Sequence, residues 1–152
     1  MTSLSGQSVL HVAGRRLPGP ASVEDVAAFE RVVGHPMPEL LKRISLEVAN
    51  GGFRPWEVVS VTKTDDWFSG CSDITMAYVP LIDRGCAMWT LIDFRTADGQ
   101  MRDWDPNLCC VGHAPAPTGQ SLAQWLTAWL QGTAHQGPYP ERASIASDCR
   151  NS

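Results

Sequence analysis

Three carboxylates, those of Asp93, Asp103 and Asp105, lie close together in the sequence and are the best candidates for holding a divalent metal ion. Mg²⁺ prefers hard oxygen ligands of this kind, and a metal held there would indicate a metal-dependent hydrolase. The usual companions in a nuclease site, a lysine or a paired glutamate nearby, are missing. We therefore keep a hydrolase only as an alternative, and expect no catalytic residue, no metal and no other cofactor.

The sequence gives no better support for a catalytic cysteine than for a metal site. Cys110 and His113 are three residues apart, and on an extended segment such residues point to opposite faces. The vicinal pair Cys109-Cys110 faces opposite sides for the same reason. The sequence holds no C-x-x-C, G-x-S-x-G, P-loop or H-E-x-x-H motif. We therefore read the five cysteines as small buried hydrophobic residues of a reducing compartment.

Tryptophan stands beside aspartate in two segments, and both are candidates for binding a protein partner: Asp65-Asp66-Trp67 and Asp103-Trp104-Asp105. Acidic charge steers a basic partner, and a buried aromatic ring holds it. If Asp103 and Asp105 share one face of a strand, Trp104 points to the other, so one interface would use the acids or the ring more easily than both. The alternative is a solvated loop and a packed tryptophan.

Composition and charge narrow the class of protein. The chain has 152 residues, 43% of them hydrophobic and 18% charged, which suits one globular domain and not a disordered chain. Its net charge of −4 argues against direct binding of nucleic acid, which needs a basic face. It shows neither a secretory signal pattern nor an apolar run long enough to span a membrane. We expect a cytoplasmic protein that binds neither membrane nor nucleic acid directly.

Val9, Leu10 and Val12 could form a short edge strand near the start of the chain, and two helices are predicted before the main run of strands. Ser22 begins a helix as its N-cap, and Gly34 ends it. Pro38 suits the first turn of a second helix, which carries an apolar stripe as far as Val48. The residues Asn50-Gly51-Gly52 end that helix, because Asn and Gly tolerate the left-handed conformation required there.

The middle of the chain predicts antiparallel strands. Residues 56–62 are rich in β-branched side chains and indicate a strand. Pro80 closes the next segment, and the apolar run from 80 to 94, the Asp98-Gly99 turn and residues 101–104 indicate a hairpin. Within it, residues 86–94 are apolar on both faces and predict a central strand. Residues 108–111 are expected to form the last strand.

A final helix follows a linker at residues 115–119. Ser121 to Gln124 form a capping box, and Trp125 and Trp129 belong to an amphipathic stripe. The order of elements predicts an α+β fold, an antiparallel meander flanked by an N-terminal helix pair and a C-terminal helix. We expect the domain at residues 22–131, an N-terminal extension at 1–21 and a flexible tail at 132–152.

Several of these segments together resemble the SMI1/KNR4 (SUKH) family over residues 22–131. The resemblance is carried by the Phe29-Glu30 helix, the Gly34-to-Leu41 connection, Asn50-Gly51-Gly52, Leu91-Ile92-Asp93 with Gly99, and the helix bearing Leu122 and Trp125. It implies one α+β domain. Many bacterial members are immunity proteins that neutralise polymorphic or contact-dependent toxins, often nucleases, by direct binding without catalysis. Fungal members regulate cell-wall synthesis within longer chains.

The resemblance also implies roles for single residues. Asn50, Gly51, Gly52 and Gly99 match motif positions whose role is backbone geometry, and Asp93 matches a position on the central strand. A carboxylate buried there must be paired, with a backbone amide or with Arg95, or must line a groove. Residues 102–107 and the loop 64–73 depart from the family pattern. We therefore expect an immunity-type protein that binds a cognate toxin, the alternative being a regulator or scaffold that binds a cellular protein.

Overall fold

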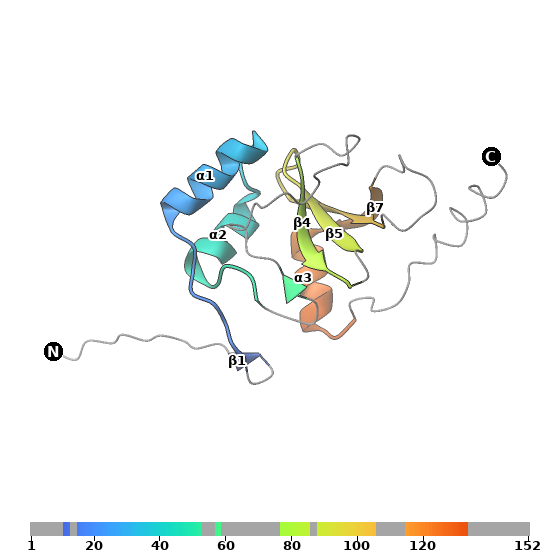
Figure 1. Ribbon diagram of the computed structural model, residues 1–152. Coiled ribbons are helices and arrows are strands. Elements are labelled where there is room, and N and C mark those ends of the chain that lie inside the picture. Colours follow the sequence, from blue (N-terminus) through green and yellow to red (C-terminus); the bar gives the residue numbers. More distant parts are fainter. Residues whose placement is uncertain are drawn as a thin grey trace.

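The computed structural model describes residues 11–12, 15–52, 57–58, 77–85, 88–105 and 115–133. Within these ranges the chain has the predicted α+β architecture, with two helices before an antiparallel sheet and one after it (Figure 1). None of the described helices is both long and apolar enough to cross a membrane. In chain order the elements are β1 (His11–Val12), β2 (Arg15–Arg16), α1 (Val23–Val33), α2 (Glu39–Glu47), β3 (Glu57–Val58), β4 (Tyr78–Asp83), β5 (Trp89–Asp93), β6 (Gln100–Trp104), β7 (Ala116–Ser121) and α3 (Leu122–Leu130).

The helix pair begins and ends where the sequence predicts. The Ser22 hydroxyl accepts a hydrogen bond from the Asp25 N–H at 3.0 Å, and Gly34 ends α1 in the left-handed conformation, with φ +78°. Glu30 then ties α1 to α2, because its carboxylate accepts from the Met37 N–H at 2.9 Å and from the Lys42 ammonium at 3.1 Å. The glutamate of the Phe29-Glu30 motif therefore has a structural role.

The Asn50-Gly51-Gly52 motif holds an earlier segment in place. The Asn50 N–H donates to the Gly19 carbonyl at 3.1 Å, and Gly52 has a φ of +80°. A Cβ on Gly52 would lie 2.5 Å from Pro18 Cδ, which leaves no room for a side chain. The Ala21 N–H also donates to the Ser45 carbonyl of α2 at 2.8 Å. The last residues of the N-terminal extension are thus bound to α2 and to the turn after it.

The sheet is an antiparallel meander in the order β3-β4-β5-β6-β7, so β5 is its central strand, as predicted. The prediction that Pro80 closes a segment is wrong, because Pro80 lies inside β4 and pairs with Leu91. The register of β4 on β5 shifts between Pro80 and Ile82. Such an irregularity accommodates a proline that cannot donate a ladder hydrogen bond. The apolar run from 80 to 94 therefore forms two strands.

The strand β7 occupies residues that the sequence analysis assigned to a linker. Pro117 and Gly119 suggest a break in the sequence. However, β7 pairs only with β6 and is the last strand in the strand order of the described sheet. Proline is tolerated on such an edge strand because one edge of it has no neighbouring strand to accept an N–H hydrogen bond. The Thr118 hydroxyl adds a hydrogen bond to the Met101 carbonyl at 2.9 Å. Other predicted segments, namely the strand at 108–111, most of the strand at 56–62, the loop 64–73 and the tail beyond 133, lie outside the described residues.

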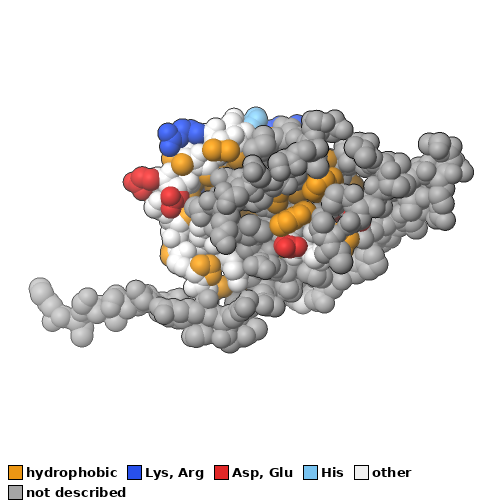
Figure 2. Space-filling view, viewed as in Figure 1, with side chains coloured by type: hydrophobic (Ala, Val, Ile, Leu, Met, Phe, Trp, Pro, Cys, Tyr) orange, Lys and Arg blue, Asp and Glu red, His pale blue; other side chains and the backbone are white. Residues whose placement is uncertain are grey.

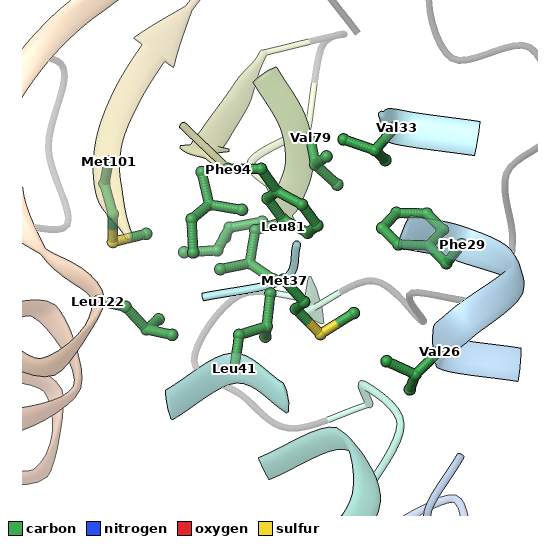
Figure 3. Close-up of a cluster of buried hydrophobic side chains, with 12 residues drawn as sticks. Val26, Phe29, Val33, Met37, Leu41, Val79, Leu81, Phe94, Met101 and Leu122 are labelled. Atoms are coloured by element: carbon green, nitrogen blue, oxygen red, sulfur yellow. The ribbon is translucent and has the colours of Figure 1, made fainter. Parts of the chain in front are cut away.

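The helices pack on one face of the sheet and enclose the hydrophobic core (Figure 3). Phe29 of α1 meets Phe94 edge to face, with ring centroids 5.8 Å apart. Leu122 at the start of α3 closes the cluster, and the predicted capping box is present, with both the Ser121 and Gln124 bonds formed. Twelve buried residues form this core: Val26, Phe29, Val33, Met37, Leu41, Val79, Leu81, Ile82, Ile92, Phe94, Met101 and Leu122.

Candidate functional site

The strand register separates the residues of the sheet into two faces. Ile92 pairs with Met101, and both belong to the core, so their face lies under the helices. Residues directly opposite in an antiparallel ladder share a face, and alternate residues change face. The other face, which we call the outer face, therefore carries several cross-strand pairs, among them Tyr78 with Asp93, Trp89 with Trp104, and Leu91 with Arg102. Leu91 is nevertheless fully buried there.

Asp103, a predicted partner-binding residue, points toward the helices. It accepts a hydrogen bond from the Thr90 hydroxyl at 2.9 Å and lies 3.6 Å from Nη1 of Arg84. The side chains of Asp103 and Arg84 are only 16% and 9% exposed. Asp103 and Trp104 therefore face opposite sides, as the strand alternation predicts, and Asp103 serves to join β6 to β5 and to the turn after β4.

Trp104 lies on the outer face directly opposite Trp89, and we call these two residues the tryptophan pair. Both are half-buried, so each ring offers part of its surface to a partner. Asp83 is the cross-strand neighbour of Trp89 on β4, and Asp105 follows Trp104 at the end of β6. In Figure 2, hydrophobic and acidic side chains likewise lie beside each other at the surface over the strands.

Sequence reasoning found Trp104 and Asp105 but missed Trp89 and Asp83. Trp89 was assigned to a covered central strand, and Asp83 belonged to no motif. Only the cross-strand register brings them beside Trp104. Asp83 has a local role as well, because its Oδ1 accepts the Gly85 N–H at 2.8 Å and shapes the turn after β4.

A second group on the outer face consists of Tyr78, Asp93, Arg95 and Arg102, and we call it the arginine cluster. Asp93 is buried and accepts hydrogen bonds from Nε and Nη2 of Arg95, both at 2.9 Å, and from the Arg95 backbone N–H at 3.0 Å. Nε of Arg102 lies 4.0 Å from Oδ2 of the same carboxylate, the oxygen that also accepts from Nη2 of Arg95. The two guanidinium carbons lie 4.6 Å (Arg95) and 5.3 Å (Arg102) from the centre of the Tyr78 ring. Asp93 thus has the pairing that its burial requires.

The electrostatics of this cluster favour the ionised forms of Asp93 and Arg95. Burial alone would raise the pKa of Asp93, but the hydrogen bonds from Arg95 and the positive charges of Arg95 and Arg102 outweigh burial and lower that pKa. The pKa of Arg95 is raised, first by its hydrogen bond to Asp93. Asp93 and Arg95 therefore form a charged, forked pair near neutral pH.

This pair predicts a pH-dependent contribution to stability. The pKa of Asp93 is lower in the folded protein than the value near about 3.9 expected for an unfolded aspartate. Its ionised form therefore stabilises the fold above the unfolded pKa, and this stabilisation is lost as the pH falls through the folded pKa. Asp93→Asn should lower the free energy of unfolding by about 1–3 kcal/mol near pH 7.

Urea unfolding from about pH 7 down to about pH 3 measures that contribution, and the gap between wild type and Asp93→Asn should close toward the acid end. Glu47→Gln is the control, since Glu47 pairs with Arg43 at 3.3 Å in an exposed position and should change stability little. A gap that stays constant with pH would contradict ionic pairing as the source of the stabilisation.

The three carboxylates considered as metal ligands do not converge. Asp93 lies on the outer face with Arg95, whereas Asp103 lies under the helices with Thr90 and Arg84. Among the described residues, no group of three His, Cys, Asp or Glu side chains is placed to hold a metal ion. Several other candidates lie outside the described residues: Asp65, Asp66, Trp67, Cys109, Cys110 and His113.

The geometry thus places two groups on one face of the sheet, the tryptophan pair with Asp83 beside it, and the arginine cluster. Asp105 follows Trp104 in the sequence, directly after the end of β6. The motif residues Asn50, Gly51, Gly52 and Gly99 lie in turns, and the three glycines have positive φ. Gly99 belongs to the β5–β6 turn, which also carries Arg95. Comparison of the chain with profiles of known protein families, with curated proteins and with solved structures finds no match in any of the three.

Proposed function

We propose that this chain is a non-catalytic, cytoplasmic protein-binding domain of the SMI1/KNR4 (SUKH) type. In this proposal it acts as an immunity protein and neutralises a polymorphic or contact-dependent bacterial toxin, such as a nuclease, by direct binding. The partner contacts the outer face of the sheet, with the tryptophan pair at the centre of the contact.

The observation that carries the proposal is the tryptophan pair itself. Trp89 and Trp104 stand opposite each other on one sheet face, are half-buried, and have Asp83 and Asp105 as neighbours. Tryptophan is enriched among the few residues that dominate binding energy at protein interfaces. The flanking carboxylates and the net charge of −4 favour a basic partner, as nucleic-acid-degrading toxins are.

The roles of the motif residues support the family assignment within this proposal. Glu30 joins the two helices, and Asn50 with Gly52 holds the preceding segment on α2. Gly99 forms the turn between β5 and β6, and Asp93 is a buried, paired carboxylate. These residues are spread along the chain, and each fixes a junction between two elements of the fold. Members of a family would keep such residues because they hold the fold together, while the residues of the binding surface differ with the partner.

Co-expression with the toxin encoded beside this gene tests the proposal. The immunity hypothesis expects the host to survive and the two proteins to elute as one complex from size-exclusion chromatography. If the toxin stays lethal in the presence of soluble immunity protein and no complex elutes, the proposal fails. A gene with no toxin beside it would instead favour the regulator or scaffold alternative, in which the same face binds a cellular protein.

A further inference from the structure

We propose that the arginine cluster is a binding site for one carboxylate group, supplied by an aspartate or glutamate side chain of the protein partner. The site itself is argued from the geometry of this chain. Its assignment to a partner's side chain rests on the binding function proposed above.

The two arginines of the cluster are satisfied unequally. Arg95 donates hydrogen bonds from Nε and Nη2 to the Asp93 carboxylate, at 2.9 Å each. Arg102 reaches that carboxylate only at 4.0 Å, and its Nη1 donates instead to the Pro115 carbonyl at 3.1 Å. Its Nε is buried and finds no hydrogen-bond acceptor within the part of the chain that the structure describes. One carboxylate therefore serves two guanidinium groups, and among the described residues Arg102 has only this 4.0 Å ion pair with Asp93 and no hydrogen bond to an anion.

The side chains of both arginines are partly exposed to solvent, although Nε of Arg102 is itself buried. The side chains of Arg95 and Arg102 are 43% and 28% exposed, whereas that of Asp93 is 4% exposed beneath them. Both guanidinium groups lie over the Tyr78 ring at cation–π distance, which helps to hold them in place. The cluster is thus a preorganised set of donors with a net positive charge.

The charge of the cluster selects the class of anion. One acid between two guanidiniums leaves a single positive charge, which a monovalent carboxylate neutralises. A phosphate dianion would exceed that charge, and the buried Asp93 carboxylate would repel it more strongly than it repels a monovalent carboxylate. The net charge of −4 on the whole chain also disfavours a polyanion. An arginine edge binds a carboxylate through parallel N–H donors, so the fit is geometric as well as electrostatic.

The arginine cluster and the acidic residues lie at different ends of the outer face, so the two ends carry opposite charge. Arg102 and Trp104 are two residues apart on β6, which places them about 7 Å apart along the strand on the same face. A partner segment lying over the tryptophan pair could therefore reach the arginine cluster with the side chain of a nearby residue. The acidic end of the face would repel an acid that the arginine end attracts, which fixes the orientation of the partner.

Acetate is the probe that tests the site. Arginine Nε–H signals of ¹⁵N-labelled protein are followed by NMR while sodium acetate replaces sodium chloride at constant ionic strength. We expect saturable shifts at Arg95 and Arg102 with half-saturation on the order of tens of millimolar, as suits so small a ligand. Arg43, which pairs with Glu47 on the exposed side of α2, is the matched control and should only drift linearly.

Two variants and a second anion sharpen the result. Arg102→Gln should abolish the saturable response at Arg95, and Asp93→Asn, which removes the internal competitor, should lower the half-saturation concentration severalfold. Phosphate should bind more weakly than acetate. Equal responses at Arg43 and in the cluster, or tighter binding of phosphate, would overturn the inference. The comparison of wild type with Arg102→Gln tests the carboxylate site even if Asp93→Asn does not fold.

The acetate titration involves no toxin. A negative titration would therefore contradict the carboxylate site alone, and a negative co-expression experiment would contradict the immunity function.

Discussion

Gly99→Ala is expected to lower the free energy of unfolding by about 2–3 kcal/mol. Gly99 is buried in the β5–β6 turn with a φ of +65°, a conformation that costs a side-chain-bearing residue about 1 kcal/mol or more. A Cβ there would also lie 2.7 Å from Cδ1 of Ile92 and 3.4 Å from Cβ of Pro38. The turn is fixed from a third side, because the Leu122 N–H donates to the Gly99 carbonyl at 2.9 Å. Urea unfolding of both proteins measures the loss.

Gly119→Ala separates the two causes. Gly119 has a similar φ of +74° but is exposed on β7, and a Cβ there would meet no atom within 4 Å. It should therefore lose only the conformational part, about 1 kcal/mol. The excess loss in Gly99→Ala measures how tightly β5, α2 and α3 meet at the turn. Equal losses would mean that Ile92 moves aside freely and that this junction has no packing requirement.

Features that depend on neighbours in the sequence were predictable. The N-caps at Ser22 and Ser121 and the left-handed stop at Gly34 each use a hydrogen bond within four residues, so their signals are local. The pairing of Asp93 with Arg95 spans two residues and is local for the same reason. Hydrophobic periodicity then gave the order of helices and strands, and with it the α+β class.

Features that depend on the strand register were not predictable. Pro80 and Pro117 both read as breaks in the sequence, yet one lies at an irregularity of β4 and the other on β7 at the end of the strand order. Both positions tolerate a missing N–H, but only the paired strands reveal this. Alternation within β6 predicted that Asp103 and Trp104 diverge. It could not predict that Trp89 stands opposite Trp104, because that requires the register of another strand.

The same limit applies to the arginine cluster. Arg102 is seven residues beyond Arg95 in the sequence, and Tyr78 precedes both by a full strand and turn. Their approach to one carboxylate depends on the pairing of Tyr78 with Asp93 across β4 and β5, and of Arg102 with Leu91 across β5 and β6. In the sequence, Tyr78, Arg95 and Arg102 have no visible relation to one another. Only the paired strands bring them together around the Asp93 carboxylate.

Trp104→Ala is expected to weaken the complex with the partner about 30-fold or more, equivalent to about 2 kcal/mol of binding free energy. The reason is that Trp104 lies half-buried on the outer face, across the strands from Trp89, and removing its ring takes away a large aromatic contact surface for the partner. Most of the change should appear as faster dissociation in surface plasmon resonance. Asp105→Asn should instead slow association, most clearly at low salt, because an acid at the edge of the contact acts by steering.

Two control variants separate binding from folding. Trp129→Ala removes a half-buried tryptophan of the same type from α3, which packs on the opposite face of the sheet and where Trp129 stacks on Trp125 with centroids 6.2 Å apart. Asp103→Asn changes the residue next to Trp104 but acts under the helices, where Asp103 meets Thr90 and Arg84. Both should reduce stability and leave the affinity of the folded protein unchanged. If Trp129→Ala weakens binding as much as Trp104→Ala, the partner contacts the helical face, and the outer face is not the binding surface.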